Sequence, residues 1–274
     1  MDEVHRYFGG SELGERRLWT DVNAWMHMQA VQWEPAGQQV LAELGDGTGL
    51  RAVDLGCGPL GWLRLLSAWV GPTGDVVGTE LTDETAQAAR HTVRGEGLSN
   101  VSVVVDDIFS SWLPDESFDL VHARFELGSL GRHDEQLATY RRLLRPGGWL
   151  VVEEPQSRTW RFNPPSPACE RLLDLAFRIL DNWGRDTELG GRLPGLLRRY
   201  CDQPGVRAHV LALPPGHLYR AGPLMMAAVM RQPFVEAVGA EELDALLAQG
   251  EEELRDPQRW CTSFVLVQAY GRVQ

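Results

Sequence analysis

The chain has 274 residues, of which 43% are hydrophobic and 23% are charged, as in ordinary globular proteins and unlike disordered or fibrous ones. Its net charge of −12 disfavours nucleic acid and anionic membrane surfaces as partners. All 26 basic residues are Arg, which excludes pyridoxal Schiff bases and the phosphate-loop lysine.

The first 50 residues predict a helical N-terminal lid ahead of the main domain. This segment carries tryptophans among polar residues and ends in an expected helix from Ala36 to Leu44. The pattern changes at Arg51, where short apolar runs begin. We therefore expect a lid over 1–50 and a main domain over 51–274.

Between Arg51 and Pro155, short apolar runs alternate with amphipathic stretches. Strands are expected over 51–56, 75–81, 101–107, 118–124 and 149–155, with helices over 61–70 and 82–97. Such alternation is typical of parallel strands that are covered by helices on both faces. The predicted fold class is a doubly wound, Rossmann-like α/β sheet.

After Pro155 the alternation stops. A proline-rich turn leads into an amphipathic helix, so we predict a helical insertion at about 157–200. Two more β-like runs, 206–213 and 263–271, lie on either side of a helical cover at about 222–255. The last run leaves no room for a crossover helix and is predicted to be antiparallel, completing a mostly parallel sheet of seven strands.

The segment VDLGCGPLG, residues 53–61, runs from a strand through a glycine turn into a helix. Gly56 and Gly58 let the backbone approach a ligand closely, and the helix N-terminus offers free amides. The spacing also fits a G-x-G-x-x-G dinucleotide fingerprint. However, Asp54 would repel a pyrophosphate and attract an ammonium group, and Glu80 can accept both hydroxyls of a ribose. The pattern favours a nucleoside that carries an amino acid.

Four motifs resemble, in order and spacing, those of the class I S-adenosylmethionine-dependent methyltransferases. The most similar branch is that of the small-molecule enzymes of ubiquinone and menaquinone biosynthesis. The motifs are VDLGCGPLG, VVGTEL, VVVDDIFSSWLPDESFDLVHARFEL and LLRPGGWLVVEEP, and they span 53–155. The resemblance implies methyl transfer as the activity and S-adenosyl-L-methionine as the cofactor.

The resemblance also implies the residues that bind the cofactor. Gly56, Gly58 and their neighbours would hold its methionine moiety, Asp54 would help to orient that end, and Glu80 would bind the ribose.

Later motifs supply the rest of the implied cofactor site. Asp107 falls where family members bind the adenine amino group, with the Ile108 amide beside it, and Arg124 falls where the chain covers the sulfonium. Two departures stand out. Asp106 occupies a position that is usually glycine, which leaves open which of the two acids faces the adenine, and Leu127–Leu130 replaces a stretch that frequently holds histidine.

Methyl transfer from a sulfonium is an in-line displacement, so a general base is optional. Glu154 is our first candidate base, because it ends the fifth expected strand and ligands of such sheets bind beyond the strand C-termini. His217, in a loop before the apolar helix, is the second candidate. His122 is interpreted as a hydrogen-bonded core histidine within a strand.

All methionines other than Met1 lie in two segments, which suggests adaptable apolar surfaces that close over the acceptor. An ordinary helix-packing role is the alternative. The predicted acceptor is an apolar or aromatic small molecule of the kind found in specialised metabolism and natural product biosynthesis. The methionines concerned are Met26, Met28, Met225, Met226 and Met230.

Other functions stay open on the sequence alone. The same fold and cofactor could serve a non-methylating reaction such as cyclisation, and the glycine spacing alone would fit a nicotinamide-dependent oxidoreductase. A non-enzymatic interaction protein is a further alternative.

The remaining expectations concern surroundings. The four cysteines lack C-x-x-C spacing, which predicts reduced thiols and no metal site. Without a signal-peptide pattern or an apolar run of roughly 18 residues, the chain is expected to be cytoplasmic and free of membrane partners. The aromatic N-terminal segment could also pack against a second subunit as a homo-oligomer.

Overall fold

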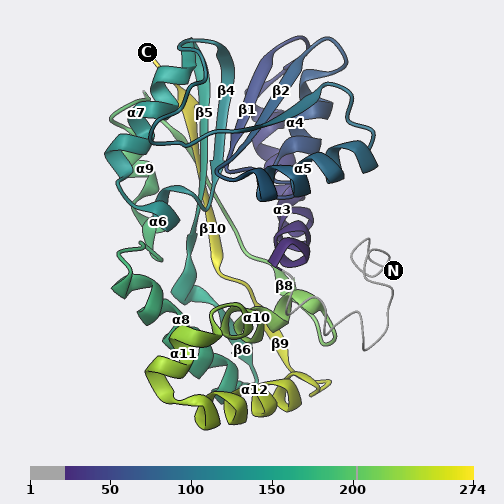
Figure 1. Cartoon of the computed structure of the whole chain (residues 1–274), viewed down its shortest axis with the longest axis vertical. Coiled ribbons are helices and arrows are strands. Elements are labelled where there is room, and N and C mark those ends of the chain that lie inside the picture. Colours follow the sequence, from purple (N-terminus) through teal and green to yellow (C-terminus); the bar gives the residue numbers. More distant parts are fainter. Residues whose placement is uncertain (1–21, 202) are drawn as a thin grey trace.

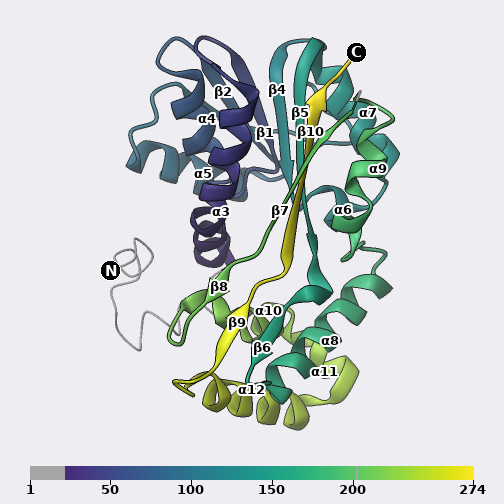
Figure 2. The same cartoon turned by 180° about the vertical axis from the view of Figure 1, so that it is seen from behind.

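The computed structural model describes residues 22–201 and 203–274. A large sheet flanked by helices forms one end of the molecule, and helices with a small sheet form the other (Figures 1 and 2). The first 21 residues of the predicted lid lie outside the described residues.

The large sheet has seven strands in the order β3-β2-β1-β4-β5-β10-β7. Strand β10 is antiparallel to both of its neighbours, β5 and the edge strand β7, whereas β1 to β5 run parallel. The predicted fold class, including an antiparallel last strand, is therefore confirmed. The strands are β1 (Arg51–Leu55), β2 (Asp75–Glu80), β3 (Val101–Val105), β4 (Phe118–Arg124), β5 (Leu144–Gln156), β7 (Gly205–His209) and β10 (Val265–Arg272).

Helices cover both faces of this sheet because successive strand residues alternate between the faces. Ala52, with its counterparts in the neighbouring strands, packs against α3, α4 and α5. Val53 and its counterparts pack against α7 and α9 on the opposite face. The helices are α3 (Val22–Leu44), α4 (Leu63–Val70), α5 (Asp83–Gly95), α7 (His133–Leu143) and α9 (Leu193–Leu197).

Helix α3 is longer than the Ala36–Leu44 helix predicted from the sequence, and it contains Pro35. Its C-terminal half, with Val40 and Leu41, packs on the sheet layer. Its N-terminal half, with Trp25 and Trp33, packs into the aromatic cluster of the second region. Helix α3 therefore packs against both regions of the molecule.

The second region combines the predicted insertion and the predicted helical cover. Helix α8 lies between an aromatic cluster and a cluster shared with α10, α11 and α12. A three-stranded sheet in the order β6-β9-β8 completes the region. The elements are α8 (Pro167–Asn182), α10 (Gly222–Val229), α11 (Arg231–Val238), α12 (Ala240–Leu254), β6 (Arg161–Asn163), β8 (Ala212–Leu213) and β9 (Trp260–Thr262).

Two sequence predictions about this region were wrong. The single run expected over 206–213 divides into β7 in the large sheet and β8 in the small sheet. The insertion expected to be helical over 157–200 also contains β6. Both differences come from pairing with β9 and β10, which lie far away in the sequence.

All four cysteine side chains are buried. Among residues 22–201 and 203–274, no helix combines the length and apolar character needed to cross a membrane. Within the same residues, no cluster of His, Cys, Asp and Glu could hold a metal ion.

Candidate functional site

The glycines of the turn after β1 have positive φ angles, which residues with a side chain rarely adopt. The φ angles of Gly56, Gly58 and Gly61 are 63°, 56° and 47°. A Cβ atom at Gly56 would lie 2.3 Å from Cδ of Glu126, and one at Gly61 would lie 2.3 Å from Oδ2 of Asp54. The turn therefore requires glycine both for its conformation and for the close approach of two carboxyl groups.

The buried Asp54 carboxylate is hydrogen-bonded to the end of this turn. Its side chain is 1% exposed, and Oδ2 accepts a hydrogen bond from the Trp62 amide at 2.7 Å. Oδ1 lies 2.6 Å from Nδ1 of His122. Both oxygens are therefore engaged within the protein, where they fix the shape of the turn.

His122 continues a chain of buried polar groups across β1, β4 and β5. Its Nε2 lies 3.3 Å from Oε2 of Glu153, which also accepts from Nε1 of Trp62 at 3.0 Å. The Trp62 ring stacks on the imidazole with centroids 3.9 Å apart. Burial alone would lower the pKa of His122, but the carboxylates of Asp54 and Glu153 outweigh it and raise that pKa. This is the hydrogen-bonded core histidine expected from the sequence.

Glu80 ends β2 opposite the turn, and its Oε1 accepts a hydrogen bond from the Gly58 amide. Burial raises the pKa of Glu80. Cys57, within the glycine turn, is 2% exposed and its amide donates to the carbonyl of Thr79 in β2. Burial, together with the charge of Asp54, raises the pKa of its thiol well above the usual range. The Cys57 thiol is therefore an inert packing group.

Two acids follow β3. Asp106 is 5% exposed and accepts from the Trp112 amide at 3.0 Å, whereas its Oδ2 has no hydrogen-bond partner among the described residues. Asp107 turns back on its own loop, accepting from the Phe109 amide at 2.9 Å. Ile108 packs against the cluster under α7 and α9. Asp106 is thus the acid with an unused buried oxygen.

The end of β4 supplies residues to both sides of the site. Arg124 directs Nη1 toward Oε2 of Glu153, 3.7 Å away. Phe125 has a φ of 64°, an uncommon angle for a side-chain-bearing residue. Glu126 lies over Gly56, and burial and the charges of Glu80, Glu154 and Asp54 raise its pKa well above the usual range. Glu126 was not anticipated from the sequence.

These residues fit a cationic nucleoside cofactor. The glycines let other groups approach the backbone of the turn closely: the Glu126 carboxyl lies over Gly56, and the Gly58 amide donates to Glu80. Burial raises the pKa values of both groups, and repulsion from neighbouring carboxylates adds to the shift. A ligand with a positive charge would relieve this repulsion, whereas a pyrophosphate would increase it.

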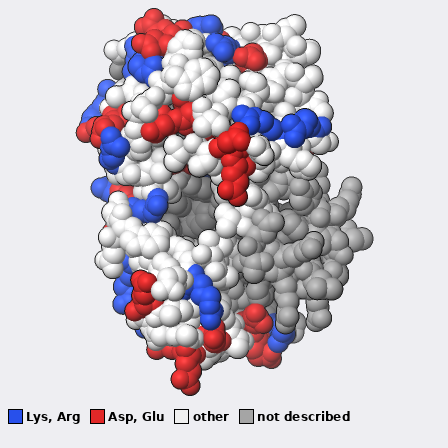
Figure 3. Space-filling view, in the orientation of Figure 1, with Lys and Arg blue, Asp and Glu red and all other residues white. Residues whose placement is uncertain are grey.

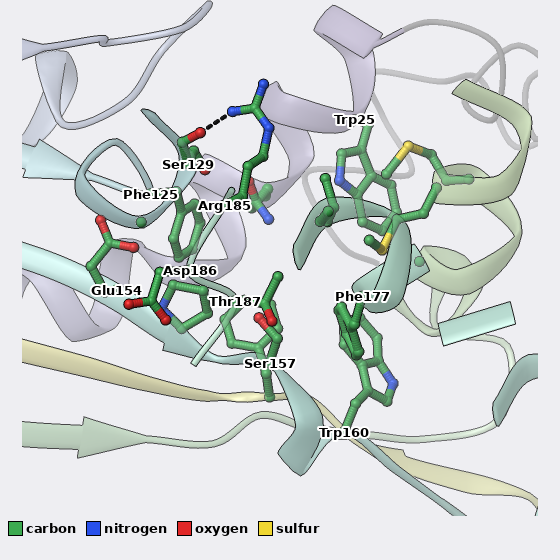
Figure 4. Close-up of a pocket in the computed structure, with 18 of the residues that line it drawn as sticks. Trp25, Phe125, Ser129, Glu154, Ser157, Trp160, Phe177, Arg185, Asp186 and Thr187 are labelled. Carbon is green, nitrogen blue, oxygen red and sulfur yellow. Dashed lines mark hydrogen bonds between the residues drawn. The ribbon is translucent and has the colours of Figure 1, made fainter. Parts of the chain in front are cut away.

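A cavity of about 270 Å³ opens next to this turn. Figure 3 shows a hollow between the two regions of the molecule, with blue atoms at its left rim. Aromatic rings line a large part of the wall, and polar groups from α6 (Leu127–Leu130), β5 and the loop after α8 gather at one end (Figure 4). The aromatic lining residues are Trp25, Phe125, Trp160, Phe177, Tyr219 and Phe264.

Glu154 lines the polar end of the cavity, as its place at the end of β5 predicted. Its side chain is 1% exposed, and Oε1 accepts from the Leu127 amide at 2.8 Å. Burial raises the pKa of Glu154 to about 8, against the effect of hydrogen bonds from the Leu127 and Gly128 amides. The neighbouring Glu153 points away and is used by the buried polar chain.

His217 does not line the cavity. It precedes the short 3-10 helix η3 (Leu218–Ala221), where its Nδ1 accepts from the Tyr219 amide at 3.2 Å. Tyr219 lines the cavity instead, and its hydroxyl accepts from Nε1 of Trp33 at 3.2 Å. Burial raises the pKa of Tyr219 to about 12, so its phenol stays protonated.

The predicted methionine segments reach the site from two sides. Met26 lies 2.9 Å from where a Cβ of Gly58 would be, so the start of α3 covers the glycine turn. Met225 and Met226 of α10 line the cavity, whereas Met28 is buried in the aromatic cluster.

Sequence reasoning missed the aromatic wall and Arg185, which lies at the polar end of the cavity. Phe125 and Glu126 follow Arg124 directly, so the end of β4 could have indicated them. No local signal marks Arg185, because the loop after α8 reaches the cavity only through the tertiary structure.

Residues 52–148 match the family described as a methyltransferase domain. Demethylmenaquinone methyltransferases of Geobacillus kaustophilus (strain HTA426) and Staphylococcus aureus (strain JH9) are 27% identical over 158 and 179 residues. These alignments cover 58% and 65% of this chain, and 65% and 68% of the relatives. The chain therefore spans about two thirds of the length of these relatives.

Solved structures share the fold at low sequence identity. The YcgJ protein of Bacillus subtilis is 15% identical with a TM-score of 0.53, over 86% of this chain and 98% of its own. The phosphoethanolamine N-methyltransferase 2 of Haemonchus contortus is 14% identical with a TM-score of 0.51, over 87% and 53%. The resemblance inferred from the motifs is confirmed: the chain carries a methyltransferase domain of the S-adenosylmethionine-dependent class, with that molecule as its cofactor.

Proposed function

We propose that this chain, in which residues 52–148 form a methyltransferase domain, methylates an apolar or aromatic small molecule at oxygen, nitrogen or carbon. One observation carries the proposal: the glycine turn and the aromatic cavity meet at the end of β4. Glu126 lies over Gly56 of the turn, and the preceding residue, Phe125, lines the cavity. A methyl donor in the turn and an acceptor in the cavity would therefore lie next to each other.

On the cofactor side, the proposed role of the chain is to bind S-adenosylmethionine and to orient it. When bound, S-adenosylmethionine supplies an electrophilic methyl group, so the protein mainly has to align the reactants. We propose that Glu80 binds the ribose hydroxyls, exchanging the Gly58 amide for them. Asp54 keeps the turn in shape through the Trp62 amide. Asp107 or the inward-facing Asp106 would bind the adenine amino group, with the Ile108 amide beside it.

On the acceptor side, the aromatic wall excludes water and holds a flat ring. Tyr219 stacks on Trp25 with centroids 5.1 Å apart, and Phe264 meets Phe125 edge to face at 5.8 Å. We propose that Glu154 accepts the acceptor's proton where the acceptor is a hydroxyl. Since its pKa is about 8, the carboxylate form is abundant only in mildly alkaline solution.

Other features of the chain support a small-molecule role in the cytoplasm. The net charge of −12 opposes binding of nucleic acid, and the four cysteines lack the C-x-x-C spacing of metal or redox motifs, as expected of reduced thiols. The aromatic cavity suits the ring systems of specialised metabolism.

Calorimetric titration with S-adenosylhomocysteine, with NAD as control, tests the cofactor side first. We expect binding of S-adenosylhomocysteine alone. At about 100 times its dissociation constant it should add roughly 2.7 kcal/mol of stability, which permits a thermal-shift screen for acceptors. Accumulation of S-adenosylhomocysteine with turnover supports methyl transfer, and turnover without it supports a reaction such as cyclisation.

A further inference from the structure

The polar end of the cavity contains the guanidinium of Arg185. Its Nη1 donates to the carbonyl of Ser129, and both residues line the cavity beside Glu154 and Asp186 (Figure 4). Arg185 also lies near enough to Glu126 for its charge to lower the pKa of that residue, opposing the stronger effects of burial and carboxylates. The guanidinium therefore lies at the end of the cavity that faces the glycine turn.

The carboxyl groups near Arg185 do not neutralise it. Asp186 forms its ion pair with Arg192 instead. Glu154 has a pKa of about 8, so its carboxyl is largely uncharged at pH 7. Within the described residues, no carboxylate forms an ion pair with Arg185.

Neighbouring arginines are arranged differently. Arg124 faces Glu153 at 3.7 Å, and Arg158 pairs with Asp181 at 2.6 Å. Arg185 is thus a permanent cation at an aromatic cavity, with a backbone carbonyl as its hydrogen-bond partner. Enclosing it under a bound ring would be costly unless the ligand brought an anion.

We propose that the acceptor is a flat aromatic molecule that carries a carboxylate, and that Arg185 binds this carboxylate. The inference rests on the proposed function, because it concerns the same cavity. A carboxylate is ionised at pH 7, unlike a simple phenol, and it matches the planar fork of a guanidinium. The aromatic rings then cover the body of the molecule.

Matched probes test this without requiring a variant to fold. Indole-3-carboxylate and indole-3-carboxamide have nearly the same shape and differ in charge. Each is titrated calorimetrically into the wild-type protein saturated with S-adenosylhomocysteine at pH 7. We expect the carboxylate to bind at least about tenfold more tightly than the amide.

Variants then assign the preference to Arg185. The substitution Arg185→Gln should remove the preference and leave the affinity for S-adenosylhomocysteine unchanged. The matched control is Arg178→Gln on α8, since Arg178 is 52% exposed and pairs with Asp174 on the surface. It should keep the preference.

The outcomes separate this inference from the proposed function. Binding of S-adenosylhomocysteine together with equal affinities for the two probes, or with no binding of either, overturns the carboxylate inference and leaves methyl transfer standing. Retention of the preference in Arg185→Gln also overturns it. Failure of the wild-type protein to bind S-adenosylhomocysteine refutes the proposed function itself.

Discussion

Replacing Glu154 by Gln should change how the stability of the protein depends on pH. The Glu154 carboxyl is 1% exposed, and its pKa is raised from 4.5 to about 8. Between these two values the unfolded chain has released the proton while the folded chain still holds it. The free energy of unfolding therefore falls as pH rises through this range, by about 1.4 kcal/mol for each pH unit.

Summed from pH 4 to pH 9, this lowers the free energy of unfolding by about 5 kcal/mol. Glutamine resembles the neutral acid in shape and can still accept from the Leu127 amide, so Glu154→Gln should cost only about 1 kcal/mol at acidic pH. At pH 9 the variant should be more stable than the wild type by several kcal/mol.

Denaturant unfolding of the two proteins at pH 5, 7 and 9 measures this difference directly. Glu170→Gln, at an exposed position of α8, serves as the control and should shift stability by a similar small amount at each pH. A stability difference between Glu154→Gln and wild type that stays constant from pH 5 to 9 would refute the reasoning. The carboxyl would then titrate as an ordinary surface group.

Three other changes probe the cofactor site, the acceptor site and the core beneath them. Glu80→Ala should weaken binding of S-adenosylhomocysteine by roughly tenfold or more, since the ribose loses its carboxylate partner. An unchanged calorimetric affinity would contradict this. Met226→Ala should weaken binding of both indole probes about equally, because Met226 lines the cavity with an uncharged side chain. A loss of affinity for S-adenosylhomocysteine instead would show that Met226 belongs to the cofactor site. Asp54→Ala should cost about 3 kcal/mol or more in unfolding experiments, because it leaves the Trp62 amide and His122 without their buried partner; a cost below about 1 kcal/mol would show that this contact is dispensable.

The core of the fold was predictable because its signals are local. Each parallel strand is a short apolar run, and each following helix has one apolar face, so periodicity alone identifies both. The run over 206–213 shows the limit of this reasoning. It has uniform β character, yet its first part pairs with β10 and its last part with β9, and pairing partners are chosen in three dimensions.

The arrangement of the glycine turn was predictable for the same reason. The turn from β1 needs glycines at Gly56 and Gly58, and Glu80 ends the neighbouring strand, so one edge of the sheet brings them together. The acceptor side was less accessible. Glu154 was predicted to reach the pocket from its place at the end of β5, and it lines the cavity. His217 was predicted as a second candidate base, but its side chain caps η3 instead.

The amino-acid sequence by itself determined the sheet, the glycine turn and the class of cofactor, because these depend on residue type at fixed spacing along one βαβ unit after another. Only the tertiary structure decided what the cavity contains. Its wall draws on α3, α8, α10 and the chain before β10, which meet through packing of apolar faces rather than through any motif. The same packing brings Arg185 and Glu154 to one cavity. Burial there raises the pKa of Glu154 to about 8, while Arg185 stays a cation without a carboxylate partner.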